Sequence, residues 1–164
     1  MQTISEPCFS FSLNQNVMSR SSEKDPHLLL ENQVCFPLYS AANAMIRAYR
    51  PLLNPLGLTY LQYMVLMVLW EESSLKVKEL GERLGLDSGT LTPLLKRLAS
   101  KGLVERERGK DDARVRVITI TQAGQQLKEK ALDIPKALAR LSGMQAAQMQ
   151  DLKNLCKQLL ATLD

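Results

Sequence analysis

Cys35 is the residue of this 164-residue chain whose type and position are best suited to chemistry. It precedes Phe36 and Pro37, and because proline is tolerated only in the first turn of a helix, a regular helix should start near Phe36. Cys35 then lies at or just before a helix N-terminus, where the helix dipole and free N–H groups favour a thiolate over a thiol. A thiolate reacts with oxidants, whereas a buried cysteine packs as a small apolar side chain. The residues around Cys35 leave both interpretations open.

Other kinds of reactive site find little support in the sequence. The remaining cysteines are Cys8 and Cys156, and the one histidine is His27. An odd number of widely spaced cysteines favours neither a disulfide framework nor a zinc site. The sequence contains no glycine-rich phosphate loop and no pattern of paired catalytic carboxylates. We therefore expect no metal ion and no cofactor, and a binding protein rather than an enzyme.

A helix-turn-helix pattern lies between residues 77 and 102. The apolar stripe of its first helix consists of Val77, Leu80, Gly81 and Leu84. Asp87 is a suitable N-cap for a second helix over residues 88–101, which Gly102 ends. The apolar stripe of that helix consists of Leu91, Leu94, Leu95 and Leu98. The opposite face is small and polar near its N-terminus and basic near its C-terminus, as a helix in a DNA major groove requires.

Two alternating segments over residues 103–108 and 115–120 predict a β-hairpin after these helices. The segment between them is charged and includes Asp112 and Arg114. A hairpin with a basic tip beside a helix-turn-helix is a winged helix, and Arg114 at its tip could enter a DNA minor groove. Asp112 is close enough in sequence to orient that arginine. The alternative is an ordinary hairpin loop with solvated charges.

The bulk properties agree with a mainly α-helical protein that carries a small β-hairpin. The chain is 45% hydrophobic, 5% aromatic and 23% charged, and its formal net charge of +4 permits nucleic-acid binding without establishing it. The longest apolar run, Met64 to Trp70, is too short to span a membrane. The N-terminus lacks the features of a signal peptide, so we expect a cytoplasmic protein.

Helices should also flank the winged helix on both sides. One is predicted from about Val34 to Leu53, and a Thr59–Gln62 capping box opens a buried helix that reaches Glu72. A helix that Pro135 kinks should run from Thr121 to about Leu141, and a capping box over 142–145 should open the last one. The apolar strip of the last helix consists of Leu152, Leu155, Cys156, Leu159, Leu160 and Leu163. A second copy could cover these outer helices, and a two-fold homodimer would match a palindromic DNA operator.

This arrangement resembles the MarR family of transcriptional repressors and, within it, the organic hydroperoxide resistance regulators. The resemblance extends from about Leu30 to Leu141. Its most specific segments are Val34–Ala42 and Asp87–Leu98, and further support comes from Ala48–Leu52, Gly57–Tyr63 and Leu80–Leu84. The wing features Asp112–Arg114 and Ile120–Gly124 are signals of the broader family.

The resemblance implies a redox sensor. A cysteine at the position of Cys35 would react with organic hydroperoxide, and tyrosines at the positions of Tyr49 and Tyr60 would hydrogen-bond its thiolate across the dimer. Fourteen residues of helix separate Cys35 from Tyr49, about 21 Å at about 1.5 Å per residue, which agrees with a contact between subunits. No cysteine occupies the position near Leu141 where some members have a second one, and Cys156 is expected to be buried in the apolar strip. Oxidised Cys35 should therefore be trapped by external small thiols.

The same resemblance implies DNA contacts by Ser88, Thr90, Lys96, Arg97 and Arg114. The Ser- and Asn-containing composition of residues 1–26, without periodicity, predicts a disordered extension, which leaves a single domain over residues 27–164. Within that domain the winged helix-turn-helix should span about 75–120, and the dimerisation helices about 33–55 and 121–163. No membrane partner is expected.

Two other functions compete with a hydroperoxide-sensing repressor. One is a MarR-type repressor that is released by a phenolic or drug-like ligand while Cys35 stays inert. The other is a thiol peroxidase with Cys35 as the nucleophile. Against the peroxidase, no arginine or glutamate stands beside Cys35 to polarise a peroxide, and the helix-turn-helix would have no role.

Overall fold

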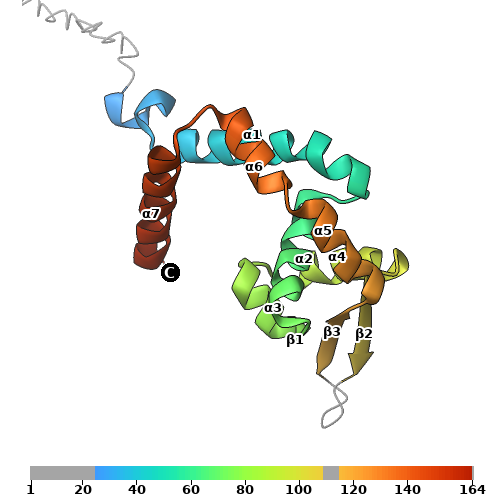
Figure 1. The fold of residues 1–164 in the computed structure, drawn as a ribbon. Helices are drawn as coiled ribbons and strands as arrows, with labels where there is room; N and C mark the ends of the chain where they lie inside the picture. Colours follow the sequence, from blue (N-terminus) through green and yellow to red (C-terminus); the bar gives the residue numbers. More distant parts are fainter. Residues whose placement is uncertain (1–24, 109–114, 164) are drawn as a thin grey trace, which may run out of the picture. The chain divides into compact units, whose positions relative to one another are not determined.

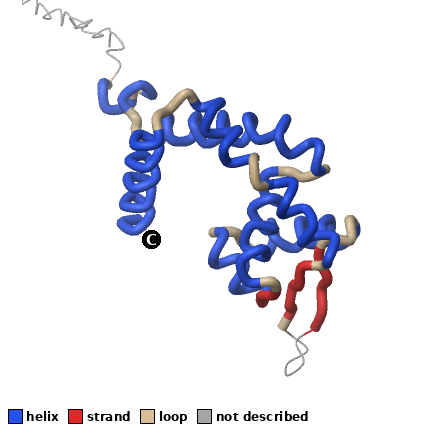
Figure 2. Tube along the Cα trace, viewed as in Figure 1, coloured by secondary structure: helices blue, strands red, loops and turns tan. Residues whose placement is uncertain are grey.

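The computed structural model describes residues 25–108 and 115–163, which are mainly helical with a small antiparallel sheet (Figures 1 and 2). The chain divides into two compact units, Met1–Tyr39 and Ser40–Asp164. The predicted extension over residues 1–26 lies almost wholly outside the described residues, as does Cys8.

Two short 3₁₀ turns, Pro26–Leu28 and Leu30–Asn32, precede the first long helix. The carboxylate of Asp25 accepts a hydrogen bond from the backbone N–H of His27 at 2.9 Å. The side-chain amide of Gln33 donates to the carbonyl oxygens of His27 and Leu29 at 2.6 and 3.1 Å. These bonds fix the chain direction immediately before Cys35.

Helix α1 spans Cys35–Leu53, so the predicted start near Phe36 is confirmed to within one residue. Pro37 is the third residue of the helix, where its missing N–H costs no intrahelical hydrogen bond. The helix ends at Leu53 as expected, a 3₁₀ turn (Asn54–Leu56) comes next, and Gly57 follows with a left-handed φ of 64°. Only Leu53 of α1, a helix described throughout, is buried within the chain.

Helix α2 spans Tyr60–Glu72, and the predicted capping box is present. The backbone N–H of Thr59 donates to Gln62 Oε1 at 3.1 Å, and that of Gln62 donates to the Thr59 hydroxyl at 3.4 Å. The helix packs against α3, α4, α5, β1 and β3, which explains why apolar residues surround its axis. Its fully buried side chains each contribute about 1.5–3 kcal/mol through removal of apolar surface from water. The buried apolar residues of α2 are Tyr63, Val65, Leu66, Val68 and Leu69.

Three strands of the described residues form an antiparallel sheet in the order β1-β3-β2. The predicted hairpin is confirmed as β2 (Val104–Arg108) and β3 (Arg116–Ile120), with Val104 opposite Ile120. Strand β1 (Ser74–Lys76) was not predicted, because its three residues are too few to show an alternating pattern. Long-range pairing creates it, because Ser74 lies opposite Thr119 and their hydroxyls are 2.9 Å apart.

The helix-turn-helix consists of α3 (Val77–Leu84) and α4 (Ser88–Ser100), and its predicted bounds and apolar stripes are confirmed. Gly81 allows the two helices to approach closely, since a Cβ atom there would lie 2.9 Å from the carbonyl oxygen of Leu86. Gly102 has a φ of 69° and follows the C-cap residue Lys101. A left-handed residue at this position is the usual way to end a helix.

The single kinked helix predicted over residues 121–141 is wrong. The structure has two helices, α5 (Gln122–Ala131) and α6 (Ile134–Ser142), separated by Leu132 and Asp133. Pro135 is the second residue of α6, where its fixed φ suits the first turn and no N–H is needed. The proline therefore starts a helix instead of bending one.

The capping box predicted over residues 142–145 is also wrong. Ser142 is the last residue of α6, and its hydroxyl donates to the carbonyl oxygen of Ala139 at 2.7 Å. Helix α7 spans Ala146–Leu163, and Gln148 Oε1 accepts from the backbone N–H of Gln145 at 2.9 Å. Cys156, expected to be buried, is only partly buried, because no residue that the structure describes fully covers the α7 strip.

Among the described residues, no single helix is long and apolar enough to cross a membrane. The bent pair formed by Cys35–Leu56 and Tyr60–Glu72 meets these criteria together, by length and composition only. Burial of the α2 side chains in the core accounts for the apolar character of the second member of this pair.

Candidate nucleic-acid interface and redox site

Helix α4 exposes all four side chains that the sequence analysis assigned to DNA contact on this helix: Ser88, Thr90, Lys96 and Arg97. Its N-terminus is closed by Asp87, which accepts from the backbone N–H of Thr90 at 2.8 Å and from its hydroxyl at 3.0 Å. These bonds, the backbone one first, lower the pKa of Asp87 below its ordinary value. Because the Thr90 hydroxyl donates to Asp87, it presents an acceptor to anything in front of the helix.

The basic residues of α4 lie in its second half, where a recognition helix meets phosphates. Lys96 and Arg97 are exposed, and the carbonyl oxygen of Arg97 accepts from the Ser100 hydroxyl at 2.9 Å. The apolar side of the helix is fixed in the core by Leu91, Leu95 and Leu98, each at most 1% exposed. The exposed basic face is therefore carried by a rigidly packed helix.

Arg114 and Asp112, the predicted wing contacts, lie outside the described residues. The strands that lead to them are described, and Arg106 on β2 and Arg116 on β3 are exposed. A role of Arg114 in a minor groove stays a prediction, as does its orientation by Asp112.

A cluster of charged residues that the sequence pattern did not predict connects α3 with α2. The guanidinium of Arg83 pairs with the carboxylates of Glu71 and Glu72, with Nη2 of Arg83 and Oε2 of Glu71 2.5 Å apart. Two adjacent acidic residues at the end of a helix are common, so nothing in their spacing pointed to Arg83. Exposed pairs of this kind contribute up to about 1 kcal/mol, and here they hold the first helix of the helix-turn-helix in place.

The two predicted sensor tyrosines lie in contact with each other. The ring centroids of Tyr49 and Tyr60 are 4.8 Å apart, and Tyr63 lies 5.9 Å from Tyr49. Burial, followed by the neighbouring Tyr60 and Tyr63 hydroxyls, raises the pKa of Tyr49 to about 12. Burial also raises the pKa of Tyr60. Both phenols therefore stay protonated at neutral pH and are able to donate hydrogen bonds to an anion.

Tyr49, Tyr60, Tyr63 and Trp70 form a row of aromatic rings in contact with one another. The rings of Tyr63 and Trp70 are 6.0 Å apart in an edge-to-face arrangement, and Trp70 Nε1 donates to the carbonyl oxygen of Gly124 at 3.0 Å. Gly124 approaches the backbone just before β2 so closely that a Cβ atom there would lie 2.2 Å from the carbonyl oxygen of Leu103. The Ile120–Gly124 segment thus positions the row, a role that its sequence did not reveal.

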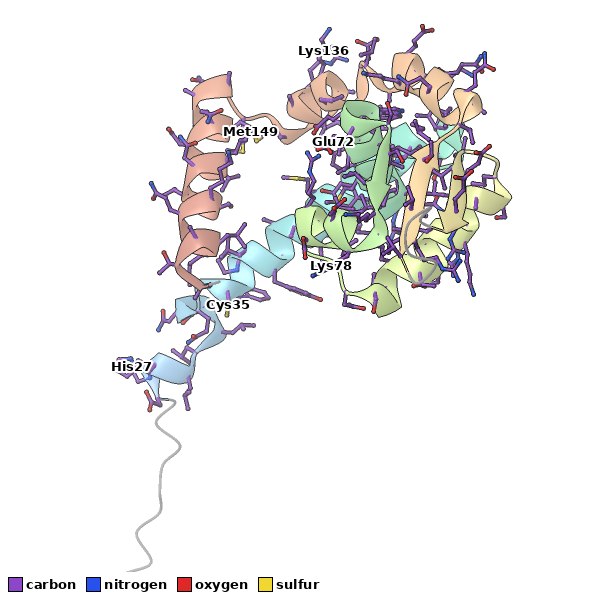
Figure 3. All side chains as sticks on the ribbon, turned by 90° about the horizontal axis from the view of Figure 1, so that it is seen from below. His27, Cys35, Glu72, Lys78, Lys136 and Met149 are labelled. Carbon is purple, nitrogen blue, oxygen red and sulfur yellow. The ribbon has the colours of Figure 1, made fainter. Side chains whose placement is uncertain are left out.

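Cys35 is the first residue of α1 and is exposed, which leaves its thiol open to an oxidant (Figure 3). It belongs to the N-terminal unit, whereas Tyr49 and Tyr60 belong to the second. A contact between the thiol and the two hydroxyls stays a prediction. In the part of the chain that the structure describes, no group of three or more histidine, cysteine or acidic residues could hold a metal ion.

Comparisons with known proteins agree with this arrangement. Residues 47–131 match the family model described as transcriptional regulator SarA/Rot. The organic hydroperoxide resistance transcriptional regulator of Bacillus subtilis (strain 168) is 47% identical over 140 residues, which cover 85% of this chain and 95% of that protein. Reduced AbfR bound to DNA superimposes with a TM-score of 0.70 at 38% identity, covering 82% of this chain and 92% of AbfR.

A third relative carries the family name. A mutant of MarR from E. coli, complexed with operator DNA, superimposes with a TM-score of 0.66 at 27% identity, covering 76% of this chain and 91% of MarR. The chain belongs to the MarR family of transcriptional regulators. As a MarR-family protein it is a DNA-binding regulator and not an enzyme, so the thiol peroxidase alternative is set aside.

Proposed function

We propose that this protein is a repressor that senses organic hydroperoxides through Cys35. In this proposal the reduced homodimer binds a palindromic operator with α4 and the wing, and oxidation of Cys35 releases the DNA. The observation that carries the proposal is an exposed cysteine at the first residue of a helix, in a chain 47% identical to an organic hydroperoxide resistance regulator. The protein would act in the cytoplasm, together with its operator.

The proposed chemistry balances with the hydroperoxide as the oxidant. The Cys35 thiolate attacks the terminal oxygen of the hydroperoxide, the O–O bond breaks, and a proton converts the leaving alkoxide into an alcohol. Cys35 becomes a sulfenic acid, and a small thiol then forms a mixed disulfide with release of water. Protonated Tyr49 and Tyr60 supply hydrogen bonds that favour the thiolate before this reaction.

Exposed apolar side chains on the outer helices support the proposed homodimer. On α7, Leu155 is 63% exposed, Leu160 59% and Leu163 75%. Tyr39 on α1 and Leu141 on α6 are likewise 69% and 62% exposed. Large exposed apolar side chains of this kind mark an interaction site, and a second copy of the chain presents the same side chains in return.

Release from DNA would follow from a change in half-site spacing. The recognition helices of a dimer must lie about 34 Å apart, one turn of the duplex, to reach two half-sites together. An oxygen or thiol adduct on Cys35 disrupts its hydrogen bonds with the tyrosines and displaces the elements that carry them. A shift of one helix relative to its symmetry mate then lowers affinity for the operator.

One observation supports the alternative function, in which a phenolic or drug-like ligand releases the repressor from DNA. Residues of α1, α6 and α7 within the second unit surround a largely apolar hollow of about 700 Å³. Tyr49 is among its lining residues, and Lys153 adds a positive charge that would favour an acidic phenol. In the proposed dimer this hollow would be shaped by the second copy as well.

One experiment separates the two functions. The reduced protein is bound to a duplex taken from the region upstream of its own gene, and cumene hydroperoxide or a phenolic acid is then titrated. Stoichiometric peroxide should release the wild type but not Cys35→Ser, whose hydroxyl cannot be oxidised to a sulfenic acid. The matched control, Cys156→Ser, should respond like the wild type. Release of Cys35→Ser by peroxide would contradict the proposal, and release of wild type by phenol alone would favour the alternative.

A further inference from the structure

Thr59, the residue directly before the predicted sensor tyrosine Tyr60, is connected with the end of the recognition helix α4 by hydrogen bonds through Gln62 and Lys101. Tyr60 is the first residue of α2, directly after the N-cap residue Thr59. The backbone N–H of Thr59 donates to Gln62 Oε1 at 3.1 Å, and Lys101 Nζ donates to the same oxygen at 3.1 Å. Lys101 Nζ also donates to the carbonyl oxygen of Gly57. A single ammonium group thus connects the end of α4 with both sides of the turn before α2.

The shared acceptor of these hydrogen bonds, the side chain of Gln62, is buried. Gln62 is 2% exposed and is the one buried polar side chain among the described residues. Its side-chain oxygen has two lone pairs, which are used by Thr59 and Lys101. If either donor moves, the oxygen loses one of its two hydrogen bonds in a place that water scarcely reaches, which is costly. Thr59 and Lys101 are therefore coupled, although they lie far apart in the sequence.

Lys101 is also firmly attached to the recognition helix. It is the C-cap residue of α4, and its backbone N–H donates to the carbonyl oxygen of Arg97 at 3.2 Å. A positive charge at this end of a helix is favourable, because the carbonyl ends of the peptide dipoles point toward it. Movement of the Lys101 ammonium is thereby transmitted to the turn of α4 that carries the exposed Arg97.

We infer that Lys101 is a positioning residue that transmits displacement of Tyr60 to the recognition helix. The inference rests on the proposed function, since Tyr60 must first be displaced by oxidation of Cys35. When Tyr60 moves, the Thr59 N–H moves with it, Gln62 follows its donor, and Lys101 draws the C-terminal turn of α4 away from its DNA-binding position. Without the ammonium, α4 remains held by Leu94, Leu95 and Leu98 in the core.

The test replaces Lys101 by methionine, which keeps the length of the side chain and removes the charge. Affinity for the upstream duplex is measured before and after one equivalent of cumene hydroperoxide, and intact mass follows oxidation of Cys35. We expect Lys101→Met to be oxidised at the wild-type rate and, when reduced, to bind the duplex within a few-fold of wild type. The ratio of reduced to oxidised affinity should fall by about tenfold, within the usual range of coupling between sites.

Two controls separate transmission from a structural or electrostatic role. Lys101→Arg keeps a donor that reaches both acceptors and should restore most of the ratio. Lys96→Met removes the same charge from the exposed face of α4 and should weaken DNA binding in both states, leaving the ratio unchanged. A Lys101→Met protein with lower melting temperature and lower affinity but an unchanged ratio would overturn the inference.

A double-mutant cycle with Tyr60→Phe tests the connection itself. If Tyr60 and Lys101 act through one chain of contacts, Lys101→Met should change the ratio less in the Tyr60→Phe background than in the wild type. Strictly additive effects would show that the two residues act separately and would overturn the inference. A wild-type protein that ignores cumene hydroperoxide would instead overturn the proposed function, a result distinguishable from both.

Discussion

The winged helix-turn-helix and the outer helices of this protein differ in how far their apolar side chains are buried within the chain. In the first region, α2, α3, α4 and the sheet cover one another, and buried leucines such as Leu66, Leu69 and Leu95 have no measurable exposure. In the second, α7 has no buried residue along its 18 described positions and leaves Leu155 and Leu163 mostly in solvent. A region that closes on itself can hold side chains rigidly for recognition. In the proposed dimer, the outer helices would be covered by a second copy and would respond to changes in the position of that copy.

The largest expected effect is a loss of folding stability, and it is tested with one leucine from each region. Leu69→Ala should lower the free energy of unfolding by about 2–5 kcal/mol, because it removes buried apolar surface and leaves a cavity. The matched change Leu160→Ala, at a residue 59% exposed in the chain, should cost far less at a protein concentration where the chain is monomeric. Urea unfolding monitored by circular dichroism measures both. Equal losses would show that α7 is as much a part of the monomer core as α2.

A charge placed on α7 tests the dimer directly. Leu155→Glu should weaken self-association by about 1.5–3 kcal/mol, because an apolar side chain no longer leaves water and a carboxylate is placed in the interface. Sedimentation equilibrium over a range of concentrations measures the dissociation constant. Gln158→Glu adds the same charge at another exposed position of the helix and should change it less. Unchanged association of Leu155→Glu would remove this strip from the interface.

The smallest expected effect concerns pH and the start of α4. The pKa of Asp87 is lowered in the folded protein, so its carboxylate favours folding above the ordinary value of 3.8. That contribution is lost as the pH falls from this value through the lowered pKa, because the proton then binds and the charged hydrogen bonds to Thr90 end. Asp87→Asn still caps the helix and should flatten this acid dependence in unfolding titrations. An identical pH profile for the two proteins would contradict the assignment.

Much of the fold follows from the local sequence, because local rules decide where helices begin and end. Pro37 fixes the start of α1, the Thr59–Gln62 capping box opens α2, and Gly102 ends α4 in a left-handed conformation. The apolar stripes of α3 and α4 have the period of a helix and are buried as expected. The residues assigned to DNA contact on α4 are exposed for the same reason, since they occupy the opposite face.

Tertiary structure decided features that depend on residues far apart in the chain. Strand β1 exists because Ser74 pairs with Thr119, and the indole N–H of Trp70 has its acceptor because Gly124 lies beside it. Local rules also failed near residues 132–145, where a proline and a serine each fit two positions relative to a helix end. Tertiary packing determines which position each residue takes: Pro135 lies in the first turn of α6, and Ser142 is its last residue.

Some features of the candidate site likewise follow from the local sequence, and others depend on tertiary contacts. The sequence by itself determined that Cys35 stands at a helix start and that polar and basic side chains share one face of α4, because both follow from helix geometry over a few residues. Only the folded chain brought Tyr49 against Tyr60 and placed the ammonium of Lys101 on the buried oxygen of Gln62. Such contacts join segments whose separation in sequence carries no periodic signal, and their energy appears only when the chain is folded.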